Sequence, residues 1–516
     1  MWHLGSQLKR SAIFVHRWMG VCFCLLFLMW FTSGIVMMYW DYPAVSNAER
    51  LQRPATLEAS KVHLSPDQAY ERLETNRAPT QVRLGMLDGR PVYRFRLEDV
   101  DSMVYADNGE TLTEISPEMA LRIASSWVKQ PPAAARVEMN TEEDQWTVSA
   151  SFWAFRPMFK YSWPNGEEVY VSSLTGDVVQ HTTRASRIGA YFGAIPHWLY
   201  FTPLRKHGAQ WSRIVIWGSG LAALTAIIGI TIGLWIYSPG KRYLCAGVPS
   251  AIPYTGQKRW HMILGLSFGL IACTWAFSGM LSMDPFPQMQ GESGAVGFPS
   301  EAIPLPGGPL QLAAYSIKDP REALAQLGSD FKARELEFTS LAGEPVYLAT
   351  MAPQQTRVIP LRGEPQAEFD RARIVEVVRQ AAQPFAPEEV RVVTRYEAYY
   401  VDRHHERPLP VILVRLNDSG HSTFYIDPRN ARIVQSYNSR ARWNRWLYHG
   451  LHSIDLPWLY RHRPAWDIVV LLLMLGGAAL CITSLILAWR VLSRKLNRSV
   501  VDRSAATSAP DLPDSA

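Results

Sequence analysis

Two histidines occupy equivalent places in two apolar segments of this chain. Five landmarks of the first segment return 245 positions later, in the same order and at the same spacing. They are His16, Gly20, Trp30, Ser33 and Gly34, which return as His261, Gly265, Trp275, Ser278 and Gly279. Two histidines at one depth of two equivalent helices can approach a shared axis from opposite sides, as the ligands of a metal ion or a haem iron do. We therefore expect His16 and His261 to hold one haem.

The glycines of this repeat favour the same interpretation. Gly20 and Gly265 follow their histidines by four residues, and further glycines follow by eighteen. Because eighteen residues make five helical turns, these positions share one face, which leaves room for a flat macrocycle. Small residues also allow close helix packing, and a histidine at a helix start can be a simple interfacial residue, so both alternatives stay open.

A second candidate pair lies before the second and fourth apolar segments. His197 and His449 stand among aromatic residues there, and repeat symmetry places both near one axis. We expect this pair to hold a second, outer haem. His452 is an alternate ligand, although its counterpart in our alignment is Tyr200. Two interfacial histidines within an aromatic belt are the alternative.

A third cluster, His404 and His405, is a candidate metal-binding or docking site. Adjacent histidines on a strand point to opposite faces, so both can bind one ion only from a loop, which Pro408 favours. A plain surface loop is the alternative.

Four stretches of 22 to 24 residues contain no Asp, Glu, Lys or Arg, and each is long enough to cross a bilayer as a helix. Basic residues cluster before the first, between the second and third, and after the fourth, so these regions are expected on the cytoplasmic side. The predicted order is 1–17 cytoplasmic, 18–40 membrane, 41–213 exported, 214–237 membrane, 238–261 cytoplasmic, 262–283 membrane, 284–467 exported, 468–489 membrane, and 490–516 a disordered cytoplasmic tail.

Each exported segment has the pattern of small α+β units. Ser65 is a predicted N-cap, a second helix is predicted over 116–128, and the Asp88-Gly89 turn predicts a hairpin between 81–87 and 92–97. We also expect strands across 146–163 and a loop over 285–310. The fold class is thus an α-helical membrane protein of four transmembrane helices, built as a duplicated two-helix unit with two exported α+β domains.

Composition excludes several functions. The net charge of +6 forms no basic stripe with interleaved aromatics, so nucleic acid is not an expected partner. None of the five cysteines lies in an exported segment, so no disulfide framework is expected there. No Cys-x-x-Cys-His motif for covalent attachment occurs, so a haem would be of the b type. Phosphate-binding and dinucleotide-binding glycine motifs are absent, so electrons must come from another donor.

Several motifs resemble those of PepSY-associated transmembrane proteins. They are the run from Arg445 to Leu459, Arg463-Pro-Ala-Trp-Asp, His16-Arg-Trp-Met-Gly, the run from Tyr399 to Pro410, and Phe424-Tyr-Ile-Asp-Pro. The resemblance implies a bacterial inner-membrane protein with exported PepSY-like domains, linked to iron uptake, since some members are haem-containing reductases of ferric siderophores.

We therefore expect a b-type haem protein, with two haems, that passes electrons across the inner membrane. The donor would be a quinol or a cytoplasmic reductase, and the acceptor a ferric siderophore or another ferric chelate. Two alternatives stay open: a non-redox PepSY protein that binds or inhibits a periplasmic peptidase, and a metal-transport accessory.

Overall fold

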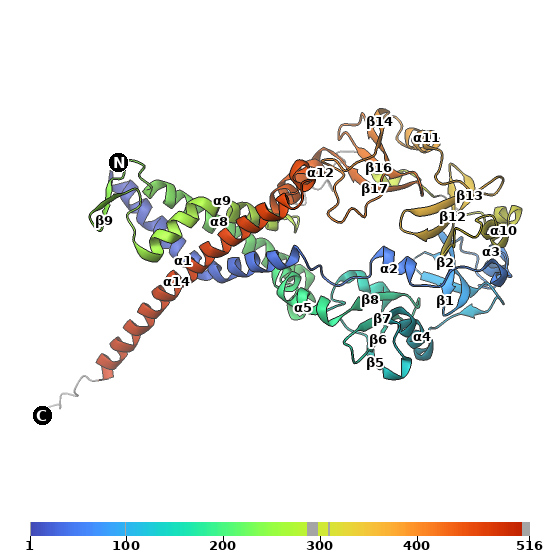
Figure 1. The fold of residues 1–516 in the computed structure, drawn as a ribbon, viewed down its shortest axis with the longest axis horizontal. Coiled ribbons are helices and arrows are strands. Elements are labelled where there is room, and N and C mark those ends of the chain that lie inside the picture. The colour runs from blue at the N-terminus through green and yellow to red at the C-terminus, as the bar shows by residue number, and fades with distance from the viewer. Residues whose placement is uncertain (1, 99, 286–297, 308–309, 508–516) are drawn as a thin grey trace, which may run out of the picture. The chain divides into compact units, whose positions relative to one another are not determined.

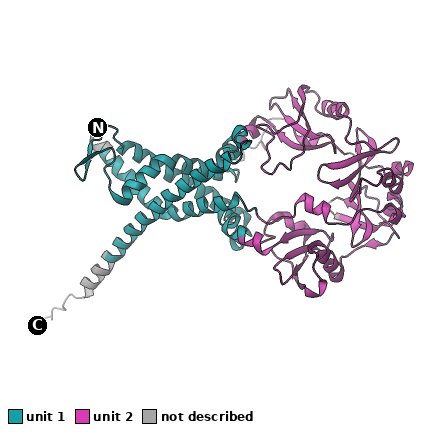
Figure 2. Ribbon diagram, in the orientation of Figure 1, with its two compact units in different colours: residues 1–41, 189–285, 446–516 teal, residues 42–188, 286–445 magenta. Residues whose placement is uncertain are grey.

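The computed structural model describes residues 2–98, 100–285, 298–307 and 310–507 (Figure 1). The chain divides into two compact units, each made of separate stretches of sequence (Figure 2). Unit 1 comprises residues 1–41, 189–285 and 446–516, and unit 2 comprises residues 42–188 and 286–445.

Unit 1 is built on four long helices, α1 (Trp2–Met37), α8 (Gly208–Ile236), α9 (Gly256–Leu281) and α14 (Ala465–Thr507). Each contains a stretch long and apolar enough to cross a membrane, as the sequence predicted. Its shorter elements are α6 (Ala194–Trp198), α7 (Thr202–Arg205), α13 (Pro457–Tyr460) and the hairpin of β9 (Tyr243–Cys245) and β10 (Val248–Ser250). Two further elements begin in the sequence of unit 2 and end in that of unit 1, α5 (Arg184–Phe192) and a π-helix over Arg445–Gly450.

The four helices pack as a closed ring in which α1 contacts α8 and α14, and α9 contacts the same two. Small residues make the close approaches possible. A side chain at Gly476 of α14 would overlap Phe268 of α9, and one at Gly477 would overlap Phe31 of α1. In a bilayer, where lipid is as apolar as leucine, such backbone-close contacts supply much of the attraction between helices.

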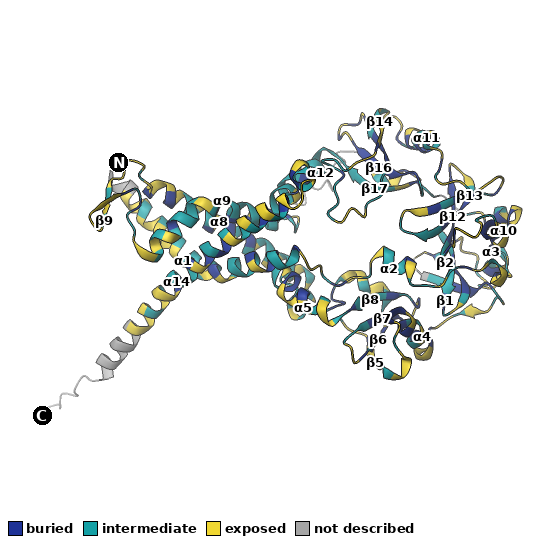
Figure 3. Ribbon diagram, viewed as in Figure 1, coloured by how far each residue is buried: buried dark blue, intermediate teal, exposed yellow. Residues whose placement is uncertain are grey.

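Exposed residues lie along the outer surfaces of these helices (Figure 3), and many of them are large and apolar. Leu25, Leu234, Leu270 and Trp489 are each at least 64 % exposed. An apolar surface that no part of unit 1 covers is what a lipid-facing helix presents.

Unit 2 contains a seven-stranded antiparallel sheet in the order β13-β12-β11-β1-β2-β3-β4. Its strands are β1 (Gln81–Leu87), β2 (Arg90–Leu97), β3 (Val100–Tyr105), β4 (Thr111–Leu112), β11 (Glu335–Leu341), β12 (Glu344–Ala352) and β13 (Gln355–Pro360). Strand β1 comes from the first predicted exported segment and pairs with β11 from the second, with Val82 opposite Phe338. The two segments thus share one sheet, a connection that the sequence did not predict.

Two helices precede the halves of this sheet, α3 (Pro66–Glu71) and α10 (Pro320–Ala325). Each begins with proline after a side chain that caps the first turn, Ser65 for α3 and Asp319 for α10. The short helix α2 (Asn47–Gln52) lies earlier in the chain.

Two four-stranded antiparallel sheets complete unit 2, each preceded in the chain by a helix. Helix α4 (Pro117–Val128) contacts the sheet of β5 (Arg136–Asn140), β6 (Met158–Ser162), β7 (Glu168–Ser172) and β8 (Val178–Thr182). Helix α11 (Arg371–Ala381) contacts the sheet of β14 (Pro387–Val393), β15 (Val411–Leu416), β16 (Thr423–Asp427) and β17 (Arg432–Tyr437). Helix α12 (Ser439–Asn444) follows β17.

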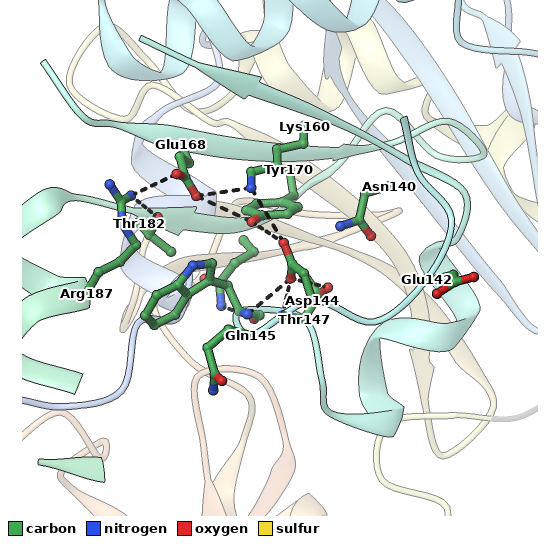
Figure 4. Close-up of polar contacts among 12 residues, drawn as sticks. Asn140, Glu142, Asp144, Gln145, Thr147, Lys160, Glu168, Tyr170, Thr182 and Arg187 are labelled. Carbon is green, nitrogen blue, oxygen red and sulfur yellow. Dashed lines mark hydrogen bonds and ion pairs between the residues drawn. The ribbon is translucent and has the colours of Figure 1, made fainter. Parts of the chain in front are cut away.

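A polar network ties the first of these sheets together (Figure 4). The Tyr170 hydroxyl donates to Asp144 at 2.6 Å, and Lys160 lies 3.7 Å from Asp144 and 3.5 Å from Glu168. Arg187 of α5 reaches Glu168 at 3.5 Å. Burial raises the pKa of Tyr170, so its hydroxyl stays a neutral donor. Because two basic groups balance two carboxylates here, we interpret the network as structural.

The local predictions hold where the turn chemistry was clear. Ser65 caps α3, the helix predicted over 116–128 forms as α4, and the hairpin around Asp88 has its predicted strands. The expected strands over 146–163 are wrong for the first part, which forms the 3₁₀ helix Ala150–Phe155. Helix α14 continues to Thr507, so the predicted disorder is wrong for 490–507. Residues 508–516, and 286–297 and 308–309 of the expected loop, lie outside the described residues.

Candidate functional site

The first histidine pair forms as predicted. His16 of α1 and His261 of α9 have ring centres 6.2 Å apart, with ring planes inclined at 38°. Two imidazoles on opposite sides of one metal ion have ring centres roughly 6.2 Å apart, since each side adds about 2.0 Å from metal to nitrogen and about 1.1 Å from nitrogen to ring centre. The spacing of the pair is thus suited to holding one metal ion between two rings.

Helix α8 holds the His16 ring. His16 Nδ1 lies 3.1 Å from the carbonyl oxygen of Thr225. Gly229, one turn further along α8, makes this approach possible, because a Cβ there would lie 2.5 Å from His16 Cε1. Since a carbonyl only accepts hydrogen bonds, the proton of the neutral His16 ring sits on Nδ1.

Helix α14 holds the His261 ring by different means. His261 Nδ1 lies 3.2 Å from Thr483 Oγ1 and 3.3 Å from Ser484 Oγ. Both hydroxyls donate their own protons to the carbonyl of Leu480, at 2.7 and 2.9 Å. Their oxygens are therefore left to accept, and the proton of the His261 ring also sits on Nδ1.

The outer pair consists of His197 and His452. Their ring centres are 6.0 Å apart and their planes are inclined at 70°. His197 lies on α6, which packs against α1, and a Cβ at Gly193 before this helix would lie 3.1 Å from Val36 Cγ1. The glycine therefore lets α6 approach α1 closely.

Matching serines hold these two rings. Ser33 Oγ lies 3.1 Å from His197 Nδ1, and Ser278 Oγ lies 3.0 Å from His452 Nδ1. Each serine donates its proton to a carbonyl of its own helix, at 2.6 Å for Ser33 to Met29 and 3.1 Å for Ser278 to Trp275. Both serine oxygens accept, so these rings carry the proton on Nδ1 as well.

The predicted pairing of His197 with His449 is therefore replaced by a pairing with His452, the ring that meets His197. His449 precedes His452 by three residues and lies against Tyr448, with ring centres 4.6 Å apart. The prediction aligned His197 with His449, and this alignment required the separation between equivalent residues of the two halves to grow along the segment.

A constant offset of 255 residues reproduces the contacts of both halves. Trp211 Nε1 donates to the carbonyl of Trp198, and Trp466 Nε1, 255 positions later, donates to that of Ser453. Leu199 has a positive φ of 53°, and Ile454 has one of 50°. The same offset takes His197 to His452.

The third cluster gathers around Asp402, whose carboxylate accepts from the backbone N–H groups of His404, Glu406 and Arg407. Burial acts to raise the pKa of Asp402, but these three donors hold it below the usual value. His405 lies against Tyr396, with ring centres 5.0 Å apart. Within the described residues, no set of three histidine, cysteine or acidic side chains is arranged to bind a metal ion. Metal binding at His404 and His405 remains a prediction.

Sequence reasoning missed the groups that orient the rings. Ser33 and Ser278 were recognised as landmarks of the repeat but not as hydrogen-bond partners. A serine one residue before the deep glycine of each segment was the available signal. Thr225, Thr483 and Ser484 gave no comparable signal, because only the packing of α8 and α14 shows which turn meets each ring.

Comparison with known families gives a match. The family described as the PepSY-associated TM region matches residues 13–283, which is more than half of the chain. This span includes His16, His197 and His261, while His452 lies beyond it. No curated protein matches the chain.

Proposed function

The chain belongs to the PepSY-associated transmembrane family, and from this premise we propose that it is a haem protein of the bacterial inner membrane that passes electrons outward to a ferric siderophore or another ferric chelate. His16 and His261 would hold an inner b-type haem, and His197 and His452 an outer one. A haem bound in this way supplies a one-electron couple between ferric and ferrous iron.

The common protonation state of the four rings carries the proposal. Every ring donates from Nδ1 to a neighbouring oxygen, which leaves the lone pair of Nε2 for a metal ion. A ligating histidine usually has its other nitrogen bonded in this way, because the bond fixes the ring and raises its basicity. Interfacial histidines have no such reason to share one tautomer.

Open space at two glycines beside the inner pair supports the proposal of a flat macrocycle there. A Cβ added at Gly20 would meet no atom within 4 Å, and one at Gly265 would meet only Leu480, at 3.9 Å. Both glycines lie one turn deeper than their histidines. With ring centres 6.2 Å apart in the inner pair and 6.0 Å apart in the outer pair, each pair would be able to hold one iron between its rings.

The two sites would provide entry and exit for an electron. On α1, His16 precedes Ser33, the partner of His197, by seventeen residues, or about 25 Å of helix. That separation spans most of a hydrocarbon core of roughly 30 Å. The basic clusters at 1–17, 238–261 and 490–516 favour a cytoplasmic side for His16 and a periplasmic side for His197.

The repeated contacts favour a duplicated two-helix unit, with unit 2 forming PepSY-like domains in the periplasm. The donor would be a quinol or a cytoplasmic reductase, since the sequence has no dinucleotide-binding glycine motif. Ligation, burial and orientation are the contributions of the protein itself.

The absorbance spectrum of the purified protein, followed by its haem content, tests the proposal. Two b-type haems per chain are expected. His16→Ala or His261→Ala should remove one haem, and His197→Ala or His452→Ala the other. His449→Ala is the matched control and should keep both. A colourless protein, or unchanged haem content in all four variants, would overturn the proposal, and metal analysis of a colourless sample would then test a metal-transport role.

A further inference from the structure

The sheet of β14 to β17 carries a row of polar side chains on the face away from α11. On the α11 side it buries apolar residues such as Val414 and Phe424. On the opposite face, Arg415 stands directly across from Thr423, which in turn stands across from Tyr437. Side chains directly opposite on neighbouring strands are close enough to act together.

A small cavity lies over this row. It has a volume of about 160 Å³, enough for several water molecules, since about 10–15 Å³ of such volume holds one. Its lining consists of Tyr399, Arg415, Thr423, Tyr425, Tyr437 and Arg442. Two arginines and three tyrosines thus surround the space, and its described lining contains no acidic residue.

Arg442 of α12 brings a positive charge that no described carboxylate balances within ion-pair distance. Its Nη2 donates to the carbonyl of His421 at 2.8 Å and to Thr423 Oγ1 at 2.7 Å. Its guanidinium lies 5.8 Å from the ring centre of Tyr399. These contacts fix the guanidinium while its Nη1 and Nε keep their hydrogen-bonding capacity.

Arg415 contributes an unused donor of its own. Its Nη1 lies 2.8 Å from a Glu389 carboxylate oxygen. Its Nε is buried without a hydrogen-bond partner, since the nearest oxygen of Glu388 is 4.0 Å away. The charge of Arg415 is thus paired with Glu389, while its Nε keeps hydrogen-bonding capacity.

A larger cavity in unit 2, of about 790 Å³, lacks this chemistry. The arginine in its lining, Arg432, donates to both carboxylate oxygens of Glu337, at 2.7 and 2.6 Å. Arg432 is therefore paired with a carboxylate, whereas Arg442 has no described carboxylate within ion-pair distance, so the larger cavity gives no comparable indication of ligand class.

We propose that the cavity between Arg415 and Arg442 binds an oxyanion, a carboxylate or phosphate group, of a ligand whose flat or apolar part packs on the tyrosines. Planar guanidinium groups recognise such anions with paired hydrogen bonds, and aromatic rings accept both the arginine stems and the body of the ligand. The proposal does not depend on haem. The anion can belong to a soluble compound or to a lipid headgroup.

Calorimetric titration of the full-length protein in detergent, with benzoate and with inorganic phosphate as probes, tests the soluble source. Arg442→Gln should weaken binding at least about tenfold, as expected for losing a charged donor. Arg440→Gln is the matched control, because it removes the same charge from α12 two residues away, a spacing that faces a different side of the helix. Arg442→Met keeps the stem over Tyr399 and serves as the second variant if Arg442→Gln does not fold.

Native mass spectrometry tests the lipid source, by counting phosphatidylglycerol and phosphatidylcholine retained by each variant. Retention of phosphatidylglycerol that falls with Arg442→Gln and not with Arg440→Gln supports a lipid phosphate as the ligand. Equal effects of the two substitutions on every probe, or no binding of any probe, would overturn the proposal. The absorbance spectrum is expected to stay unchanged in Arg442→Gln, so failure here is distinct from failure of the haem assignment.

Discussion

Gly229→Ala is the substitution that most directly tests how the inner histidine pair is held. The new Cβ would lie 2.5 Å from His16 Cε1, whereas ordinary contacts begin near 3.4 Å. The His16 ring must therefore move by about 1 Å. A shift of that size is half of a metal–nitrogen bond of about 2.0 Å, so we expect the bond to be lost.

The effect on stability can be separated from helix propensity. Alanine favours a helix over glycine by about 1 kcal/mol, and forcing extra volume into a packed site costs about 1–3 kcal/mol. Gly218→Ala is the matched control, since it lies on the same helix and its Cβ would meet no atom within 4 Å. The difference between the variants should thus be about 1–3 kcal/mol, with Gly229→Ala the less stable.

The assay is haem content per chain together with thermal unfolding of both variants in one detergent. Gly218→Ala should keep both haems, while Gly229→Ala should keep only the outer one. If Gly229→Ala proved as stable as Gly218→Ala and kept both haems, the proposed contact between α8 and His16 would be refuted.

Three further outcomes are expected. Ser33→Ala and Ser278→Ala remove the hydrogen-bond acceptors of the outer histidine rings. In a redox titration these variants should change the reduction potential of the proposed outer haem and leave that of the inner haem unchanged. An outer potential identical to that of the wild type would contradict the role given to the serines. Reporters fused near Gln180 and Asn430 should report a periplasmic location, and a cytoplasmic signal from either would reverse the topology. The pKa of Asp402 is lowered in the fold, so the stability that its carboxylate contributes is present above the ordinary aspartate pKa of about 3.9 and is lost as the pH falls below that value. Thermal unfolding measured against pH should show this acid-dependent loss in the wild type and a smaller loss in Asp402→Asn. Equal slopes of melting temperature against pH in the two proteins would exclude this contribution.

Elements set by local chemistry were predictable from the sequence. Charge-free stretches of membrane length gave the four long helices, and the N-cap serine Ser65 gave the start of α3. The sharing of one sheet by β1 and β11 was not predictable, because strand pairing between distant segments depends on which edges meet and not on local pattern.

The inner pair was predictable because both histidines lie within the transmembrane helices whose repeat they define. The partners of their rings were not, since a carbonyl such as that of Thr225 leaves no mark in a sequence. Only Gly229 hinted at the contact, and a glycine in a membrane helix is equally explained by close packing.

The outer pair shows what a repeat must satisfy before its residues are paired. His207 and His462, and likewise Trp211 and Trp466, are separated by 255 positions, and that offset alone assigns His452 to His197. Matching Leu199 to Leu451 preserved residue type but required a three-residue shift within a short segment. The backbone decides between the two alignments, because the left-handed conformation of Leu199 recurs at Ile454, 255 positions on. Turn geometry is therefore the stronger guide to equivalence here. The same left-handed turn follows each histidine whose ring lies against a serine, Ser33 of α1 for His197 and Ser278 of α9 for His452.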